Sequence, residues 1–312
     1  MKKQLIKVAI LATGMLALAS CNKEEVVVKA ATNQNAIANR VIFESVEEYE
    51  NLFEDPKTID QKTNEVAARF GTYNEAARVG TALEDTLYPE VLQKILNDDH
   101  VVQIGQWLIK VDVAKQQVLV LDKKYLDQYS DLASSNLDNK NILVYSTEDE
   151  VLEMLQNQVK PSAARTSGLF CRQVKNRDPN LGPNILIESI TSSSGLIGQR
   201  YIQPGVDYSS YGIYYKLYGN VISKFQQNGT FGFYSYNIPS LTIGCAGSWK
   251  INCKNDGSIG NEFTLSNTYE NLYTFYSGAK SISKSDVRII AKSYLTNGSI
   301  HETPIFYDSR SN

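Results

Sequence analysis

Few residues in this chain can carry metal-binding or catalytic chemistry. The 312-residue sequence contains two histidines, His100 and His301, and neither has a histidine or cysteine partner at zinc-site spacing. The sequence also lacks the G-x-S-x-G nucleophile elbow, the Walker loop and the G-x-G-x-x-G fingerprint. From these absences we expect no metal, no cofactor and no catalytic residue of a standard motif.

Long apolar runs and basic clusters are absent as well. The N-terminal apolar run Val8–Ala19 has 12 residues, whereas a membrane-spanning helix needs about 20. Lysines and arginines do not gather with interleaved aromatic residues, as phosphate recognition requires. The sequence therefore argues against a transmembrane anchor and against a nucleic-acid partner.

Residues 1–20 have the features of a secretory signal peptide. Three lysines lie in the first seven residues, the apolar run Val8–Ala19 follows, and small residues directly precede Cys21. This arrangement resembles the lipobox of bacterial lipoproteins. The resemblance implies that the Cys21 thiol receives lipid and that Cys21 becomes the first mature residue. Two or more acyl chains give lasting membrane attachment, because each buried methylene adds about 0.8 kcal/mol.

The residues after Cys21 bear on which membrane face the protein occupies. Asn22 is followed by Lys23, Glu24 and Glu25, which resembles the lipoprotein export signal of Bacteroidetes. That resemblance implies an outer-membrane lipid anchor with the protein exposed at the cell surface. The alternative is that these charges belong only to a solvated tether, residues 21–40, and that the protein faces the periplasm.

Charge and tyrosine content divide the mature chain into two parts. Residues 21–168 contain 15 basic and 25 acidic residues, net −10, whereas 169–312 contain 13 and 9, net +4. Of the 19 tyrosines, 13 lie in the second part. We therefore expect two separately packed domains, at 41–160 and 169–312, joined by a linker at 161–168.

The first domain alternates between helical and strand-like patterns and is expected to be an acidic α+β unit. Helices are predicted at 46–54, 58–70, 83–96, 125–133 and 148–156, and strands at 101–105, 107–113, 117–121 and 141–145. Two capping boxes support this assignment, Ser45 with Glu48 and Thr147 with Glu150. Pro89 interrupts the third helix.

The second domain loses the helical period and is expected to be an all-β, antiparallel, sandwich-like fold. Strands are predicted at 184–190, 212–221, 231–238, 241–254, 258–265 and 286–295, separated by clusters of Gly, Asn, Ser and Pro. Asn255-Asp256-Gly257 is the clearest hairpin turn, because these residue types tolerate positive φ angles.

The layout as a whole resembles uncharacterised lipoprotein families of Bacteroidetes. The similarity lies in the lipobox, the segment Val41–Tyr49, and the tyrosine-rich stretch Tyr211-Gly212-Ile213-Tyr214-Tyr215. It extends to Ile95-Leu96-Asn97 before Gln103-Ile104-Gly105 and to Asn141-Ile142-Leu143 before Thr147-Glu148-Asp149. The resemblance implies a location and an architecture, and it implies no activity.

Aromatic side chains of the second domain are the best candidates for ligand contact. Alternation places Tyr214 and Tyr218 on one strand face and Tyr215 and Leu217 on the more apolar face. We therefore expect Tyr214 and Tyr218, together with Trp249, to face solvent and to contact a ligand. The alternative is that tyrosine is simply a good strand former.

Three cysteines remain after Cys21, which allows one disulfide in an oxidising compartment. Cys245 and Cys253 share a strand parity and would lie ~26 Å apart in one extended strand at ~3.3 Å per residue. A disulfide requires Cα atoms within about 7 Å. We therefore expect any bridge to join Cys171 with Cys245 or Cys253.

These features predict a lipid-anchored surface protein whose β domain binds a glycan or a protein without catalysis. An alternative is an envelope assembly component that docks through its acidic domain. A third possibility is a glycoside hydrolase, which would need two carboxyl groups facing one cleft about 5–9.5 Å apart.

Overall fold

The computed structural model describes residues 40–55, 57–70, 87–160, 180–235, 241–251, 254–265 and 270–311. The chain forms two compact units, each made of non-contiguous segments. The first unit contains Met1–Ser45, Asp60–Lys110 and Leu119–Ile142, and the second contains Val46–Ile59, Val111–Val118 and Leu143–Asn312. The domain limits expected from sequence stay a prediction. The signal peptide and the linker lie outside the described residues.

Strands dominate the described residues, and their pairing is mainly antiparallel. One five-stranded sheet has the order β1-β2-β3-β4-β5. Its strands are β1 (Ile42–Phe43), β2 (Val101–Ile104), β3 (Trp107–Asp112), β4 (Gln117–Asp122) and β5 (Ile142–Ser146). β2 and β3 pair as a hairpin around Gly105, whose φ of +57° lies in the region that favours glycine. The strands predicted here from sequence are confirmed to within two residues.

Most helices are shorter than their sequence patterns predict, whereas the helix predicted at 125–133 begins two residues earlier, as a 3-10 helix. They are α2 (Val46–Asn51), α3 (Ile59–Phe70), α6 (Glu90–Ile95), η1 (Lys123–Gln128), α7 (Tyr129–Ala133) and α8 (Val151–Gln156). Proline explains the late start of α6. Pro89 is the N-cap residue with φ −65° and an extended ψ of 150°, and it cannot continue a helix from the preceding side.

The predicted capping box at α8 is wrong. The helix begins at Val151, and the Glu150 side chain makes no capping hydrogen bond. One oxygen of the Glu150 carboxyl instead accepts from Ser281, 131 residues later in the chain. A long-range partner therefore replaces the local one that the sequence pattern suggests.

A six-stranded sheet, termed sheet B, has the order β10-β9-β8-β6, with β13 paired to β9 and β7 to β8. Its strands are β6 (Asn180–Leu181), β7 (Ile185–Ser192), β8 (Gly195–Ser210), β9 (Tyr215–Gln227), β10 (Tyr234–Ser235) and β13 (Glu270–Gly278). The longest of these, β8, is not expected from sequence. Its Pro204 lies between the part of β8 that pairs with β7 and the part that pairs with β6.

The third sheet, termed sheet D, has the order β12-β11-β14-β15, with β16 also paired to β14. Its strands are β11 (Leu241–Ile251), β12 (Lys254–Leu265), β14 (Ile282–Tyr294), β15 (Ile300–Glu302) and β16 (Phe306–Ser311). The turn predicted at Asn255-Asp256-Gly257 is wrong, because these residues lie within β12, where Asn255 and Gly257 pair with Lys250 and Trp249 of β11. Ile251 and Lys254 are the last register pair of this hairpin.

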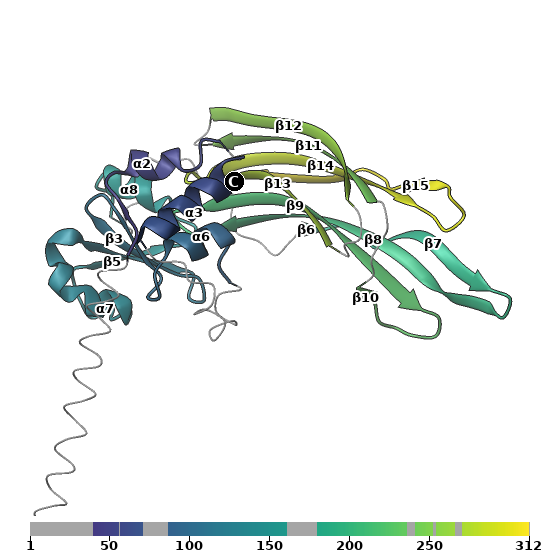
Figure 1. Ribbon diagram of the computed structural model, residues 1–312, viewed down its shortest axis with the longest axis horizontal. Coiled ribbons are helices and arrows are strands. Elements are labelled where there is room, and N and C mark those ends of the chain that lie inside the picture. The colour runs from purple at the N-terminus through teal and green to yellow at the C-terminus, as the bar shows by residue number, and fades with distance from the viewer. Residues whose placement is uncertain are drawn as a thin grey trace, which may run out of the picture. The chain divides into compact units, whose positions relative to one another are not determined.

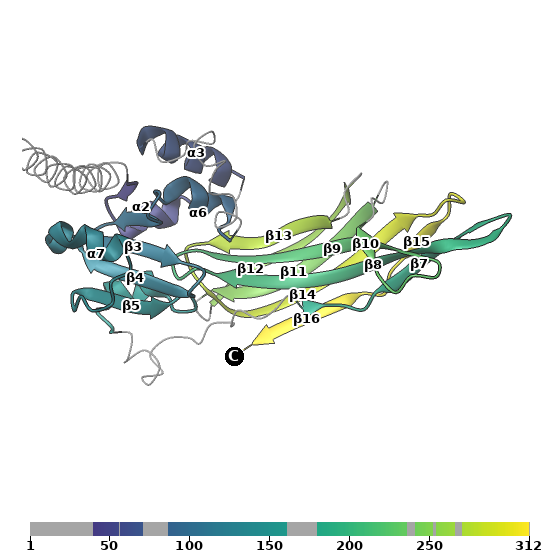
Figure 2. The same ribbon diagram turned by 90° about the horizontal axis from the view of Figure 1, so that it is seen from below.

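Sheets B and D share one hydrophobic core, and their long strands run side by side in Figure 1 and Figure 2. Sheet B contributes residues of β7, β8, β9 and β13, and sheet D contributes residues of β14. The buried members are Ile187, Ile202, Val206, Tyr208, Tyr215, Leu217, Val221, Phe275, Ile282, Val287, Ile289 and Ala291. Burying each large apolar side chain stabilises the fold by about 1.5–3 kcal/mol. Antiparallel β structure after Leu169 is thus confirmed over the residues described.

Candidate functional site

The two faces of sheet B differ in chemistry because side chains alternate along each strand. On β8, Ile202, Val206 and Tyr208 point into the core, so the odd-numbered residues point to the outer face. On β9, Leu217 and Val221 point inward, so the even-numbered residues point outward. The outer face of sheet B is therefore the surface on which a ligand could meet this sheet.

Tyr218 lies on this outer face, half-buried. Its phenol donates a 2.6 Å hydrogen bond to Oδ2 of Asp207, its register partner on β8. The Lys216 ammonium lies 5.2 Å from the centre of the Tyr218 ring. Burial and the Asp207 carboxylate raise the pKa of Tyr218 well above its ordinary value. The hydroxyl is therefore a neutral donor held by Asp207, and a ligand would meet mainly the ring.

Tyr214 does not face solvent, and that expectation from sequence is wrong. The strand begins at Tyr215, after a bend in which Gly212 has a φ of +77°. Tyr214 therefore lies outside the alternation of β9 and is only 3% exposed. Its ring packs against Phe53, with centroids 5.5 Å apart. The structure uses Tyr214 as a core residue.

Trp249 and the cysteines are the other residues singled out from sequence. Trp249 lies in β11, next to a register shift between Trp249 and Lys250, and its side chain is outside the described ones. Cys245 lies in the same strand. Cys21, Cys171 and Cys253 fall outside the described residues, so the disulfide and the lipidation stay predictions.

Farther along the outer face lies an aromatic group that the sequence reasoning missed. Tyr201 on β8 and Phe233 before β10 meet edge to face, with ring centroids 5.2 Å apart and planes at 89°. The Lys224 ammonium lies 5.5 Å from the Phe233 ring centre. Tyr201 and Lys224 are register partners, which places all three side chains on one face. We call Tyr201, Lys224 and Phe233 the outer-face cluster.

The outer-face cluster is open to solvent and continues into other exposed apolar side chains. Phe233 is 42% exposed, and Phe231, two residues earlier, is fully exposed at 102%. Leu186, the register partner of Tyr201 on β7, is 43% exposed. Single exposed apolar residues are ordinary on protein surfaces, whereas a contiguous group marks a binding surface.

Amide side chains border the outer-face cluster. The Tyr201 phenol donates a 2.6 Å hydrogen bond to Oε1 of Gln199 and lies 3.4 Å from Oε1 of Gln226. The Lys224 ammonium donates to Oε1 of Gln203 and, at 3.2 Å, to Oδ1 of Asn184. The cluster thus combines exposed rings with uncharged donors and acceptors. Sequence alternation along 195–203 could have revealed it, but Gly195, Gly198 and Pro204 obscured the strand.

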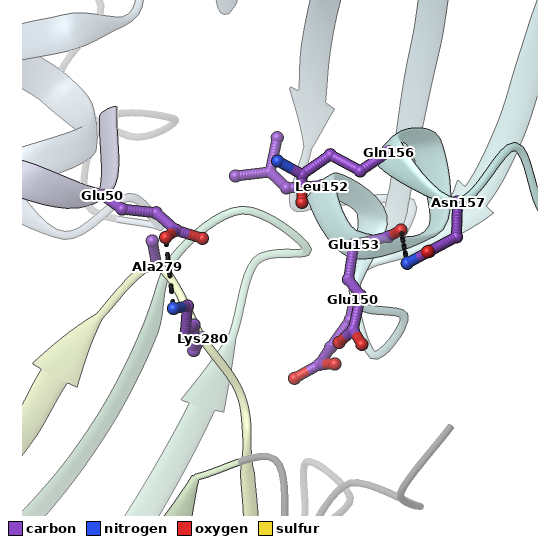
Figure 3. Close-up of a pocket in the computed structure, with 8 residues that line it drawn as sticks. All are labelled: Glu50, Glu150, Leu152, Glu153, Gln156, Asn157, Ala279 and Lys280. Atoms are coloured by element: carbon purple, nitrogen blue, oxygen red, sulfur yellow. Dashed lines mark hydrogen bonds and ion pairs between the residues drawn. The ribbon is translucent and has the colours of Figure 1, made fainter. Parts of the chain in front are cut away.

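A second feature is a pocket of about 250 Å³ in the second unit, shown in Figure 3. Residues of α2, of α8 and of the turn between β13 and β14 line it: Glu50, Glu150, Leu152, Glu153, Gln156, Asn157, Ala279 and Lys280. The Lys280 ammonium is paired with Glu50 at 3.1 Å. Burial, followed by the neighbouring Glu153, raises the pKa of Glu150 to about 8.

The described residues contain no group of three or more His, Cys, Asp or Glu side chains arranged to hold a metal ion. Among the helices that the structure describes, none has the length and apolar character needed to cross a membrane.

The likeness of this chain to known proteins is weak. No family model matches the chain, and no curated protein matches it either. Among solved structures, the chain is similar to a DUF4848 family protein from Bacteroides thetaiotaomicron. The two share 11% sequence identity, over 89% of this chain and 82% of that chain, with a TM-score of 0.18. A TM-score this low does not establish a shared fold.

Proposed function

We propose that this protein is a lipid-anchored surface protein that binds a glycan, without catalysis, through the outer-face cluster. The observation that carries the proposal is the solvent-exposed pair of rings, Tyr201 and Phe233, set among amide side chains on one sheet face. Sugar rings present apolar C–H faces and many hydroxyl groups. An exposed aromatic ring offers a flat apolar surface for the former.

The amides beside the rings suit the hydroxyl groups of a sugar. Gln199 and Gln226 each carry a donor and an acceptor group, and both lie within 3.4 Å of the Tyr201 phenol. Carboxylates are absent from the described partners of this cluster, and Lys224 is its one cation. This balance favours a neutral or weakly acidic glycan over a strongly charged ligand.

The location of the protein is part of the same proposal. Acylation of Cys21 would attach the chain to the outer membrane, and the Lys23-Glu24-Glu25 segment supports export to the cell surface. Residues 41–160 would form an α+β unit close to the membrane, in the manner of uncharacterised Bacteroidetes lipoproteins. The β-sandwich would then present the outer-face cluster to ligands.

A glycan array with soluble protein from Asn22 onward tests the binding function. We expect saturable binding that falls at least tenfold in Phe233→Ala. The matched control is Tyr307→Ala, since Tyr307 is an aromatic on β16, in sheet D, that is more exposed than Phe233. Equal binding by both variants, or no sugar retained by the wild type, would reject the proposal. Saturable binding of one purified envelope protein instead would favour the assembly role.

A further inference from the structure

We propose that the ligand of the outer-face cluster is a linear glycan of several sugar units, which extends along β8 and β9 as far as Tyr218. This inference rests on the proposed glycan-binding function and names the class of sugar, a stretch of polysaccharide chain rather than a single sugar. We call the outward-facing surface of β8 and β9 between Tyr201 and Tyr218 the outer-face stripe.

The two aromatic ends of the outer-face stripe are held at a fixed separation. β8 and β9 pair in one register along their shared length, without a β-bulge. Tyr201 is opposite Lys224 in this register, and Tyr218 is opposite Asp207. From Lys224 to Tyr218 the strand advances six residues, or ~20 Å at ~3.3 Å per residue. A single sugar ring is much shorter than this, so only a chain of sugars contacts both rings.

The middle of the outer-face stripe carries an exposed apolar side chain. Gly205 and Asn220 are register partners there, and a Cβ at position 205 would lie 2.3 Å from Oδ1 of Asn220. Asn220 is only 6% exposed. Leu181 of β6 lies against the same row, since its Cδ2 would be 2.7 Å from that Cβ, and Leu181 is 43% exposed. A sugar chain that crosses this row therefore meets Leu181, which suits the apolar C–H face of a sugar ring.

Polar groups lie on either side of this apolar middle. Gln203 and Ile222 form the row next to Tyr201, and both are half-buried. The Gln203 amide donates a 2.7 Å hydrogen bond to the backbone oxygen of Gly182, which fixes its orientation. At the far end, Thr274 of β13 is exposed and is the register partner of Tyr218. Aromatic, amide, apolar and hydroxyl groups thus follow one another along the stripe, and a sugar chain likewise repeats C–H faces and hydroxyl groups.

The position of the outer-face stripe within sheet B favours a sugar chain over a peptide strand. A peptide that adds to a sheet needs a strand edge with unpaired backbone groups. β8 pairs with β9 on one side and with β6 and β7 on the other, and β9 pairs with β8 on one side and with β10 and β13 on the other. Recognition on this face therefore depends on side chains, as binding of a glycan does.

Calorimetric titration tests the inference. The mature chain from Asn22 onward is titrated with fragments of one to six sugar units, cut from the polysaccharide that the glycan array identifies. We expect affinity to rise at least tenfold from the disaccharide to the hexasaccharide. Tyr218→Ala should remove this rise and leave disaccharide binding unchanged, whereas Tyr218→Phe, which keeps the ring, should retain the rise. Tyr294→Ala is the matched control, since Tyr294 is a 47% exposed aromatic on β14 of sheet D, and it should bind every fragment as the wild type does.

Leu181→Arg provides a second test that does not disturb the bond between Tyr218 and Asp207. It places a long charged side chain in the middle of the stripe, at an exposed position. We expect the hexasaccharide to bind no better than the disaccharide, with an unchanged unfolding temperature.

The outcomes separate this inference from the proposed function. Equal affinity of the wild type for disaccharide and hexasaccharide would overturn the linear chain, as would a rise retained in Tyr218→Ala or in Leu181→Arg. Loss of disaccharide binding in Phe233→Ala would still support glycan binding by the outer-face cluster in each of these cases. An array that retains no glycan would reject the proposed function itself and the inference with it.

Discussion

The phenol of Tyr49, in α2, donates a 2.9 Å hydrogen bond to the backbone oxygen of Ile213, 164 residues later in the chain. Both residues are completely buried, and the Tyr49 ring also packs edge to face on Phe53, 5.3 Å away. This contact joins the short helix α2 to the segment that leads into β9. The short helix α2 is therefore a structural part of the unit that contains sheets B and D.

Replacing Tyr49 with Phe tests that bond. The variant keeps the ring but leaves the buried oxygen of Ile213 without this donor. We expect the free energy of unfolding to fall by about 1–3 kcal/mol, measured by denaturant titration. The control is Tyr307→Phe, because Tyr307 is 62% exposed, and its effect should stay within about 0.5 kcal/mol. Equal stability of the two variants would contradict a structural role for the Tyr49 hydroxyl.

The bend before β9 requires glycine for two separable reasons. Gly212 has a φ of +77°, and a Cβ there would lie 2.5 Å from Cγ2 of Val118. We expect Gly212→Ala to destabilise the protein by about 2–4 kcal/mol, the sum of a positive-φ cost and overpacking. Gly229 has a similar φ of +80° with no atom within 4 Å, so Gly229→Ala reports the backbone cost alone. Thermal unfolding that shifts equally in both variants would show that Val118 accommodates the methyl group.

Arg200 and Glu188 form a buried ion pair between β8 and β7. Their side chains are 3% and 9% exposed and lie 2.7 Å apart. Glu188→Gln leaves the buried guanidinium without its anion, so we expect a loss of about 3–5 kcal/mol in unfolding free energy. Glu302→Gln is the control, since Glu302 meets Lys292 at 3.7 Å while 54% exposed, and it should change stability by less than about 1 kcal/mol.

The same pair predicts a loss of stability in acid. Burial acts to raise the pKa of Glu188, but hydrogen bonds from Thr296 and Arg200, with the Arg200 charge, outweigh it and lower the pKa below 4.5. The stabilising charge is therefore present above about pH 4.5 and is lost as the pH falls through the lowered pKa. Unfolding free energies measured between pH 2 and 6 should fall with acid less steeply in Glu188→Gln than in the wild type. Parallel profiles would show that Glu188 does not contribute.

Lipid attachment is tested at Cys21. We expect Cys21→Ser to abolish palmitate incorporation and to move the protein from the membrane fraction to the soluble fraction, because the apolar run Val8–Ala19 is too short to span a bilayer. Cys245→Ser is the matched control and should leave labelling unchanged. Membrane fractionation of Cys21→Ser like that of the wild type, without label, would reject the lipid anchor.

Local patterns in the sequence predicted the elements whose contacts are mostly local. The hairpin of β2 and β3 follows from two apolar runs separated by Gly105-Gln106, and α3 follows from its helical period. Alternation also assigned Tyr215 and Leu217 to the apolar face of β9. Such predictions succeed because neighbouring residues supply both the pattern and the turn.

Features that depend on residues far apart in the sequence became visible only in the tertiary structure. Only the pairing of β8 with β7, β6 and β9 makes a long strand from a segment containing Gly198, Gly205 and Pro204. Only the bend at Gly212 places Tyr214 in the core, and Ser281, 131 residues later in the chain, hydrogen-bonds the Glu150 carboxyl. From composition and short spacing alone, the sequence predicted a signal peptide, a candidate acylated Cys21 and a β-rich second half. The outer-face cluster and the surroundings of the Glu150 carboxyl arise from residues brought together by sheet register and burial, which no local pattern records.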